Sequence, residues 1–252
     1  MHRRAQTSIG AAALAVLVLA AGACGGSGKS GSGNKATTTS TTASVPSTST
    51  TVLLTTDSKV AAALDGTILT AAEVQSALAL PAPPQPFTGT GAAPPPPQGP
   101  LSLDGVAKVF PDPAYKGLLE QGEASVGANK TYAAAIGAGA VINVLAVKFK
   151  DATTGGTFVQ SATQVATTFG GAKTNAHPEV KIGVVPAAVL VVPPAPGAQA
   201  ETVVIATLYQ DGVYYQVSSS AAPGSVKDEV VLKLLAAQDA KYQRTKASIP
   251  AS

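Results

Sequence analysis

The sequence predicts an α+β domain in which an antiparallel sheet carries helices on one face. Strand-like apolar runs are joined by tight glycine-containing turns, which indicates antiparallel neighbours. Two amphipathic helices are expected, one over residues 154–169 and one after residue 225. Because strands and helices come in blocks rather than in strict alternation, the helices should gather on one face of the sheet.

Residues 1–23 have the three parts of a secretory signal peptide. Arg3 and Arg4 supply the positive charge, and an apolar run from Ile9 to Ala20 follows, then small residues. The apolar run is shorter than the roughly 20 residues that a membrane-spanning helix needs. We therefore expect the rest of the chain to be exported across the membrane.

Cys24 is the sole cysteine, so no intramolecular disulfide or cysteine metal cluster can form. The residues around it resemble the lipobox of bacterial lipoproteins, whose cysteine receives a diacylglyceryl group and becomes the first mature residue. Gly22, Ala23 and Cys24 match that pattern, and Ala21 stands where leucine is usual. Because Ala21-Gly22-Ala23 is also an A-x-A cleavage site, plain secretion is the alternative to lipid attachment at Cys24.

The stretch after Cys24 ends in Gly28-Lys29-Ser30, which is also the end of a P-loop. A P-loop needs a first glycine where this chain has Ala23, and it needs a preceding strand that the sequence does not offer. Nucleotide binding is therefore rejected. Residues 24–57 are instead predicted to be a disordered Gly/Ser/Thr-rich tether with an average reach of roughly 30 Å.

Residues 58–80 are predicted to contain a short helix. Thr70 and Glu73 form a capping box, and the helix should end before Pro81. The proline-rich residues 81–100 are predicted to be a stiff spacer. The sequence leaves open whether the helix packs on the domain that follows the spacer.

The α+β domain is predicted over residues 101–246. A hairpin is expected between 124–135 and 141–149, with its turn at Gly137–Gly139. The same glycines resemble the start of a dinucleotide fingerprint, but Ile142 occupies the third glycine position and a strand follows where a helix is required. The hairpin interpretation is therefore preferred.

The second half of this domain is predicted to hold two helices with strands between them. The first helix runs from Thr154 to Phe169 and stops at Gly170-Gly171, and the last runs from an N-cap at Ser225 to about Arg244. Residues 247–252 are predicted to be a disordered tail. The strands expected between the helices are 182–192, 202–209 and 213–219, the last two joined by the Asp211-Gly212 turn.

Residues typical of catalysis are scarce. His177 is the one histidine left after removal of the leader, and beside Pro178 it is expected to be a solvated loop residue. Asp228 and Glu229 are neighbours on a helix and point apart, so they cannot grip one substrate and instead complement the positive end of that helix. We therefore predict no catalytic, cofactor or metal site. The one site residue predicted is Cys24, for lipid attachment.

The charge distribution excludes one class of partner. The formal net charge is +3, and it falls to +1 once Arg3 and Arg4 are removed with the leader. No basic block remains to form the concentrated cationic surface that nucleic-acid binding requires. The oligomeric state is not indicated by the sequence.

As a whole, the chain resembles the lipoproteins of actinobacterial cell envelopes. The resemblance rests on the AAGACGG end of the leader, the Thr/Ser tether, Leu69–Glu73 and Asp211–Val217. The chain is also similar to the extracellular sensor domains of actinobacterial Ser/Thr kinases, although it lacks their paired cysteines.

The resemblance implies a membrane-anchored, non-catalytic extracytoplasmic module that binds a lipid, a cell-wall fragment or another envelope protein. The binding surface would be an open face of the sheet or the gap between sheet and helices. A secreted or envelope hydrolase with an unrecognised active site is the alternative.

Overall fold

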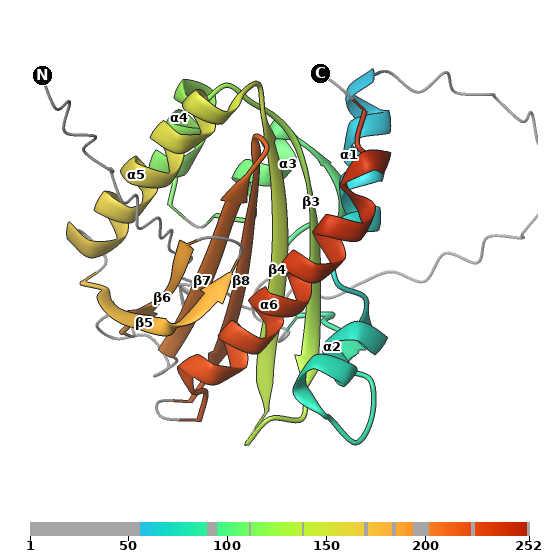
Figure 1. Cartoon of the computed structure of the whole chain (residues 1–252), viewed down its shortest axis with the longest axis vertical. Coiled ribbons are helices and arrows are strands. Elements are labelled where there is room, and N and C mark those ends of the chain that lie inside the picture. Colours follow the sequence, from blue (N-terminus) through green and yellow to red (C-terminus); the bar gives the residue numbers. More distant parts are fainter. Residues whose placement is uncertain are drawn as a thin grey trace, which may run out of the picture.

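The computed structural model contains an antiparallel eight-stranded sheet flanked by helices (Figure 1). The leader, Cys24 and most of the predicted tether lie outside the described residues. None of the helices in the described part of the chain is long and apolar enough to cross a membrane. The described residues are 56–89, 95–110, 112–137, 139–168, 171–182, 185–193, 202–222 and 225–250.

The strand order is β1-β3-β4-β8-β7-β6-β5, and β2 also pairs with β3. Every neighbouring pair is antiparallel. The antiparallel α+β class predicted from the sequence is therefore confirmed. The strands are β1 (Gln85–Pro86), β2 (Gly99–Ser102), β3 (Ala124–Ala134), β4 (Ala140–Phe149), β5 (Lys173–Ile182), β6 (Val185–Val192), β7 (Thr202–Gln210) and β8 (Val213–Ala221).

Both predicted hairpins are present. β3 and β4 pair up to Ala134 and Ala140, on either side of the glycine turn. β7 and β8 are joined by Asp211 and Gly212, whose φ angles of 53° and 71° are those of a type I′ turn. These positive φ angles explain why Asp-Gly is a strong turn signal at this position.

Helices cover both faces of the sheet rather than the single face that the sequence predicted. On one face, Val144 of β4 packs in a core with α1, α2 and α6. On the other face, Leu145 and Phe149 pack in a second core with α3, α4 and α5. The helices are α1 (Thr56–Thr67), α2 (Ala71–Leu78), α3 (Leu103–Ala107), α4 (Ala114–Gln121), α5 (Ala152–Thr168) and α6 (Asp228–Thr245), with a 3₁₀ turn at Lys246–Ser248.

The segment before the proline-rich run packs on the sheet, which answers the question that the sequence left open. Leu64 and Ile68 are fully buried in the same core as α6. The Gln238 side chain of α6 fixes this contact, because it accepts a hydrogen bond from the Leu69 N–H at 3.1 Å and donates one to the Thr67 carbonyl at 2.8 Å. α1 and α2 therefore belong to the same packed unit as the sheet.

The predicted capping box at the start of α2 is confirmed and is extended by a lysine from α6. Glu73 accepts a hydrogen bond from the Thr70 N–H at 2.8 Å, and the Thr70 hydroxyl accepts one from the Glu73 N–H at 3.3 Å. The ammonium group of Lys241, which is 8% exposed, reaches Glu73 at 2.6 Å and the Ile68 carbonyl at 2.7 Å. This lysine therefore binds the capping-box carboxylate of α2 and a carbonyl just before that helix, and it is largely removed from solvent.

The helix starts differ from the predicted ones. The N-cap of α6 is Lys227, so the expected cap at Ser225 is wrong. α5 begins two residues before the expected Thr154, because the Asp151 carboxylate accepts hydrogen bonds from the Thr153 and Thr154 N–H groups at 2.8 and 2.9 Å. Phe169 lies outside the described residues.

The two ends of α6 lie at opposite ends of the molecule (Figure 1). Its last turns lie beside α1, where the described chain begins. Its first turn lies at the other end, near α2 and the turn between β3 and β4. The start of the described chain and the start of α6 are therefore separated by most of the length of the domain.

Candidate functional site beside the first turn of α6

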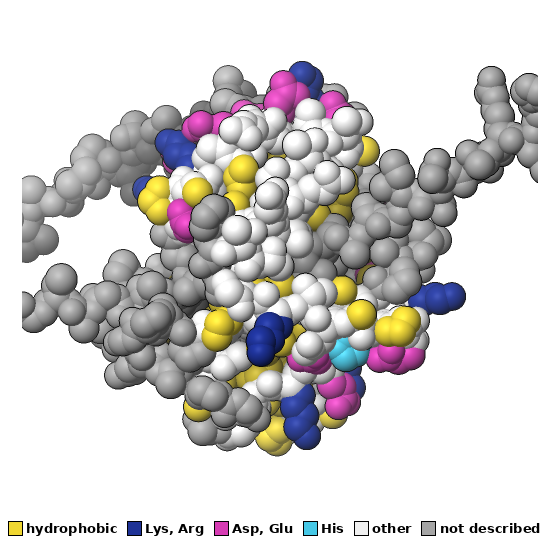
Figure 2. All heavy atoms as spheres, turned by 90° about the vertical axis from the view of Figure 1, so that its left-hand side faces the viewer, with side chains coloured by type: hydrophobic (Ala, Val, Ile, Leu, Met, Phe, Trp, Pro, Cys, Tyr) yellow, Lys and Arg dark blue, Asp and Glu magenta, His cyan; other side chains and the backbone are white. Residues whose placement is uncertain are grey.

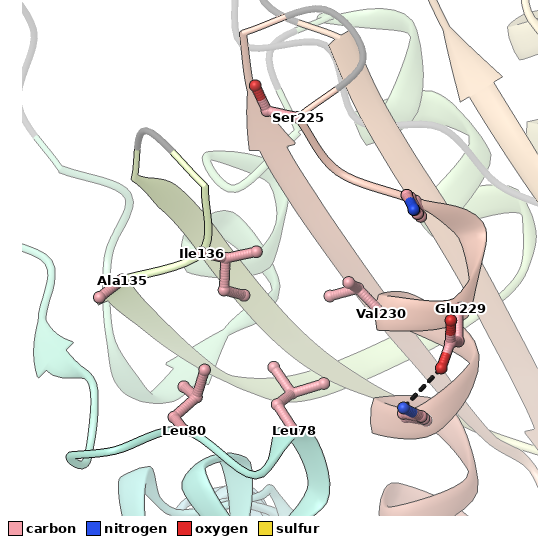
Figure 3. A pocket seen from close by; sticks show the side chains of 9 residues that line it. Leu78, Leu80, Ala135, Ile136, Ser225, Glu229 and Val230 are labelled. Carbon is pink, nitrogen blue, oxygen red and sulfur yellow. Dashed lines mark ion pairs between the residues drawn. The ribbon is translucent and has the colours of Figure 1, made fainter.

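A groove of about 330 Å³ opens between α2, the β3–β4 turn and the start of α6 (Figure 3). Its apolar wall consists of side chains that are only partly buried, although they contact the main core. These side chains come from three elements that are far apart in the sequence, and they face one another across the groove. They are Leu78, Leu80, Ile136 and Val230, with Ala135 beside them.

Backbone hydrogen bonds hold the apolar wall in place. Ala79 adopts a left-handed conformation with φ of 51°, and the Leu80 N–H donates to the Gln75 carbonyl at 3.0 Å, which is the 6→1 bond of a Schellman motif. This reversal places Leu78 and Leu80 on the same wall. Across the groove, the Ile136 carbonyl accepts a hydrogen bond from the Gly139 N–H at 2.9 Å, which closes the β3–β4 turn.

The rim of the groove is charged and is formed by α6 and the residues just before it. Lys233 pairs with Glu229 at 2.6 Å (Figure 3), and the lysine lowers the pKa of that carboxyl. Lys227 is exposed and forms no ion pair with any of the described residues. The rim therefore combines one ion pair with a second lysine, Lys227, whose charge also lowers the pKa of Glu229, and these three groups together have a net charge of +1.

Two other hollows lie elsewhere on the described part of the domain. A wider hollow of about 570 Å³ beside α1 is lined largely by small or polar residues such as Ala62, Ser102 and Ser125. A cavity of about 10 Å³ near Phe87 and Asn143 has room for about one water molecule. The groove at α6 is the better candidate, because it combines several large, partly exposed apolar side chains with convergent charges.

His177 lies on another side of the same first turn of α6 and is held between two carboxylates. Its Nε2 atom is 3.0 Å from Oδ2 of Asp228, and its Nδ1 atom is 3.0 Å from Oε1 of Glu179. Asn175 also donates to Asp228, at 2.8 Å. Hydrogen bonds to Asp228 and then to Glu179 raise the pKa of His177. Figure 2 shows the histidine at the surface, flanked by acidic side chains.

The sequence placed His177 in a solvated loop, and this prediction is wrong. The residue lies in β5, the edge strand of the sheet, and its side chain is 23% exposed. Pro178 is compatible with this strand because an edge strand does not need every N–H for pairing. The register of β5 on β6 shifts just after His177, which marks an irregular edge.

This histidine cluster is suited to joining elements rather than to chemistry on a substrate. With a carboxylate at each ring nitrogen, the imidazolium form donates both protons and leaves no lone pair to act as a general base. The two carboxylates lie against different nitrogens of the ring. Among the described residues, no group of three or more His, Cys, Asp or Glu side chains could hold a metal ion.

The first turn of α6 serves both features. Asp228 turns to the histidine, whereas Lys227, Glu229 and Val230 line the groove. The prediction that Asp228 and Glu229 point apart is therefore confirmed by their different partners. The groove itself was missed, because no local pattern brings residues 78–80, 136 and 227–233 together.

Comparisons with known proteins identify no family for this chain. No protein-family model and no curated protein matches the sequence. Among solved structures, the chain is similar to the extracellular domain of PknH from Mycobacterium tuberculosis, with a TM-score of 0.43 and 12% identity. The match covers 71% of this chain and 95% of that one.

Proposed function

We propose that this protein is a membrane-anchored extracytoplasmic lipoprotein that binds its ligand in the groove beside α6. The observation that carries the proposal is the groove itself, in which partly exposed Leu78, Leu80, Ile136 and Val230 meet a charged rim. The module is non-catalytic in this proposal. The engagement of both ring nitrogens of His177 supports that part, because it occupies the one histidine outside the leader.

The anchor in this proposal is a diacylglyceryl group on Cys24. Two acyl chains give stable membrane attachment where a single chain is marginal, since each buried methylene contributes about 0.8 kcal/mol. The Gly/Ser/Thr-rich residues 24–57 would then act as a flexible leash of roughly 30 Å. The support is the lipobox-like sequence that ends in Cys24.

The anchor is tested by replacing the cysteine. Cys24→Ser should move the protein from the membrane fraction to the medium or the soluble fraction, and mass spectrometry should show an acylated Cys24 as the first residue of the wild type only. Ser27→Ala, three residues away, is the matched control and should stay attached. A Cys24→Ser protein that remains as firmly attached as the wild type would contradict the anchor.

Binding in the groove is tested separately in intact cells. A benzophenone amino acid at Leu80 points a photoreactive group into the groove, and the same group at Glu120 of α4 reports the exposed surface of the other layer of helices. We expect a specific adduct from the Leu80 position. Equal labelling from both positions would reject the groove as a binding site, whatever the result for Cys24.

A further inference from the structure

We propose that the groove binds the alkyl chain of a fatty acid, with Lys227 contacting the carboxylate. This inference rests on the proposed function, because it assigns a ligand class to the same groove. Three features of the described residues carry it: the volume of the groove, the separation of its apolar and polar ends, and the charge left on its rim.

The volume of the groove limits the ligand to a narrow one. Sites for small molecules span about 300–1,000 Å³, and the groove, at about 330 Å³, is at the low end of that range. One extended alkyl chain fits such a volume better than a diacyl lipid or a folded peptide segment.

The lining is divided into an apolar end and a polar end. Leu78, Leu80, Ala135 and Ile136 supply only aliphatic side chains, whereas Ser225 and the charged side chains all come from the start of α6 or the residues before it. Figure 3 shows the aliphatic groups facing one another on the side away from that helix, with Val230 between the two ends. An amphiphile matches this division, because its alkyl chain can contact the aliphatic side chains while its polar head group contacts the charged side chains.

The charge on the rim favours a head group with a single negative charge. Lys233 is neutralised by Glu229 at 2.6 Å, and Asp228 turns away to His177. Lys227 is thus left without an ion pair among the described residues of the rim. A carboxylate complements one ammonium group, whereas a phosphate that approaches a net charge of −2 would remain partly uncompensated.

The test uses the full chain with Cys24→Ser, so that no acyl group of the anchor can occupy the groove. cis-Parinaric acid, a fluorescent fatty acid, is titrated against its methyl ester. We expect the acid to bind more tightly than the ester by roughly threefold, which is the effect of one solvent-exposed ion pair. In competition with saturated fatty acids, removal of two methylenes that lie in the groove should weaken binding about tenfold.

Variants of the protein separate the contribution of the ligand's carboxylate to affinity from that of its alkyl chain. Lys227→Gln should weaken the acid by roughly threefold and leave the ester unchanged. Lys150→Gln, which removes an exposed lysine paired with Glu123 outside the groove, is the charge-matched control and should change neither. Leu80→Asn should weaken acid and ester alike, and an unchanged melting temperature would show that this partly exposed position was altered without unfolding.

The results distinguish this inference from the proposed function. Equal affinities for acid and ester, no dependence on chain length, or no effect of Leu80→Asn would each overturn the fatty-acid assignment. If the photoreactive group at Leu80 captures a protein or a cell-wall fragment while parinaric acid does not bind, the ligand class is wrong and the binding module stands. If neither experiment gives a signal from the groove, both proposals fail.

Discussion

Protonation of His177 should stabilise the domain at acidic and neutral pH, and this effect should disappear as the pH rises. Asp228 and Glu179 raise the pKa of the ring above its usual value of 6.5 in the folded protein. A group whose pKa is raised on folding contributes its full stabilisation below the pKa of the unfolded state. That stabilisation is then lost as the pH rises through the pKa of the folded state.

The size of the effect follows from the exposure of the partners. The side chains of His177 and Asp228 are both 23% exposed, whereas that of Glu179 is 65% exposed. We therefore assign the stabilisation to the contact between His177 and Asp228. Hydrogen bonds to charged groups contribute about 1.5–3 kcal/mol when buried, and exposed ion pairs about 0.2–1 kcal/mol. Between these limits, we expect the contact with Asp228 to stabilise the folded state by about 1 kcal/mol.

Replacement of the histidine measures this contribution directly. At pH 5.5, below the usual pKa of the imidazole, His177→Gln should lower the melting temperature by about 2–4 °C, as expected for 1 kcal/mol in a domain of about 150–250 residues. At pH 9 the ring can donate only one proton, and the difference between wild type and variant should shrink towards zero.

Thermal unfolding followed by circular dichroism between pH 5.5 and pH 9 gives these differences. Titration of the imidazole proton signals by NMR gives the pKa of His177, whose signal is identified by its absence from the spectrum of His177→Gln. The reasoning is refuted if that pKa lies at or below 6.5. It is also refuted if His177→Gln lowers the melting temperature equally at both ends of the pH range.

Three further predictions concern the core. Gly127→Ala should destabilise the domain by about 2 kcal/mol in urea unfolding, because the new Cβ would lie 2.6 Å from the Ala146 carbonyl oxygen across β3 and β4. Lys241→Met should cost about 2 kcal/mol, since it leaves the partly buried Glu73 without its cation. Burial raises the pKa of Tyr132 to about 12, so its phenolate absorbance should not appear at pH 10.5.

Each of these predictions has a control within the chain. Gly117→Ala adds a Cβ that meets nothing within 4 Å on α4, and it should stabilise by helix propensity rather than destabilise. Lys150→Met removes an exposed lysine and should have little effect on unfolding. Similar effects at Gly127 and Gly117, or at Lys241 and Lys150, would contradict the packing and pairing arguments. Ionisation of Tyr132 near pH 10 would contradict its burial.

The hairpins could be predicted because their signals are local. A type I′ turn requires positive φ angles at two adjacent residues, and Asp211-Gly212 is a residue pair that adopts them readily. The number of faces covered by helices was harder to predict. The run Val141–Phe149 is apolar at almost every position, which is typical of a strand buried on both faces. The prediction considered only one face of this strand and therefore expected helices on one side of the sheet.

The candidate site could not be predicted in the same way. β5 was missed because Lys173–Ile182 contains Asn, Pro and Glu, which have low strand propensity, and its position at the sheet edge makes the strand acceptable. The groove depends on a left-handed residue at Ala79, a conformation that alanine rarely adopts. Its three walls meet only once the sheet and α6 have packed, so long-range contacts decide it.

The separation between the start of α1 and the first turn of α6 bears on how an anchored copy would meet its surroundings (Figure 1). A leash joined at residue 56 is attached at one end of the domain, and the groove lined by Leu80 and Lys227 lies towards the opposite end. The attachment point would therefore not cover the groove, and a flexible leash would leave the domain free to turn the groove away from the bilayer.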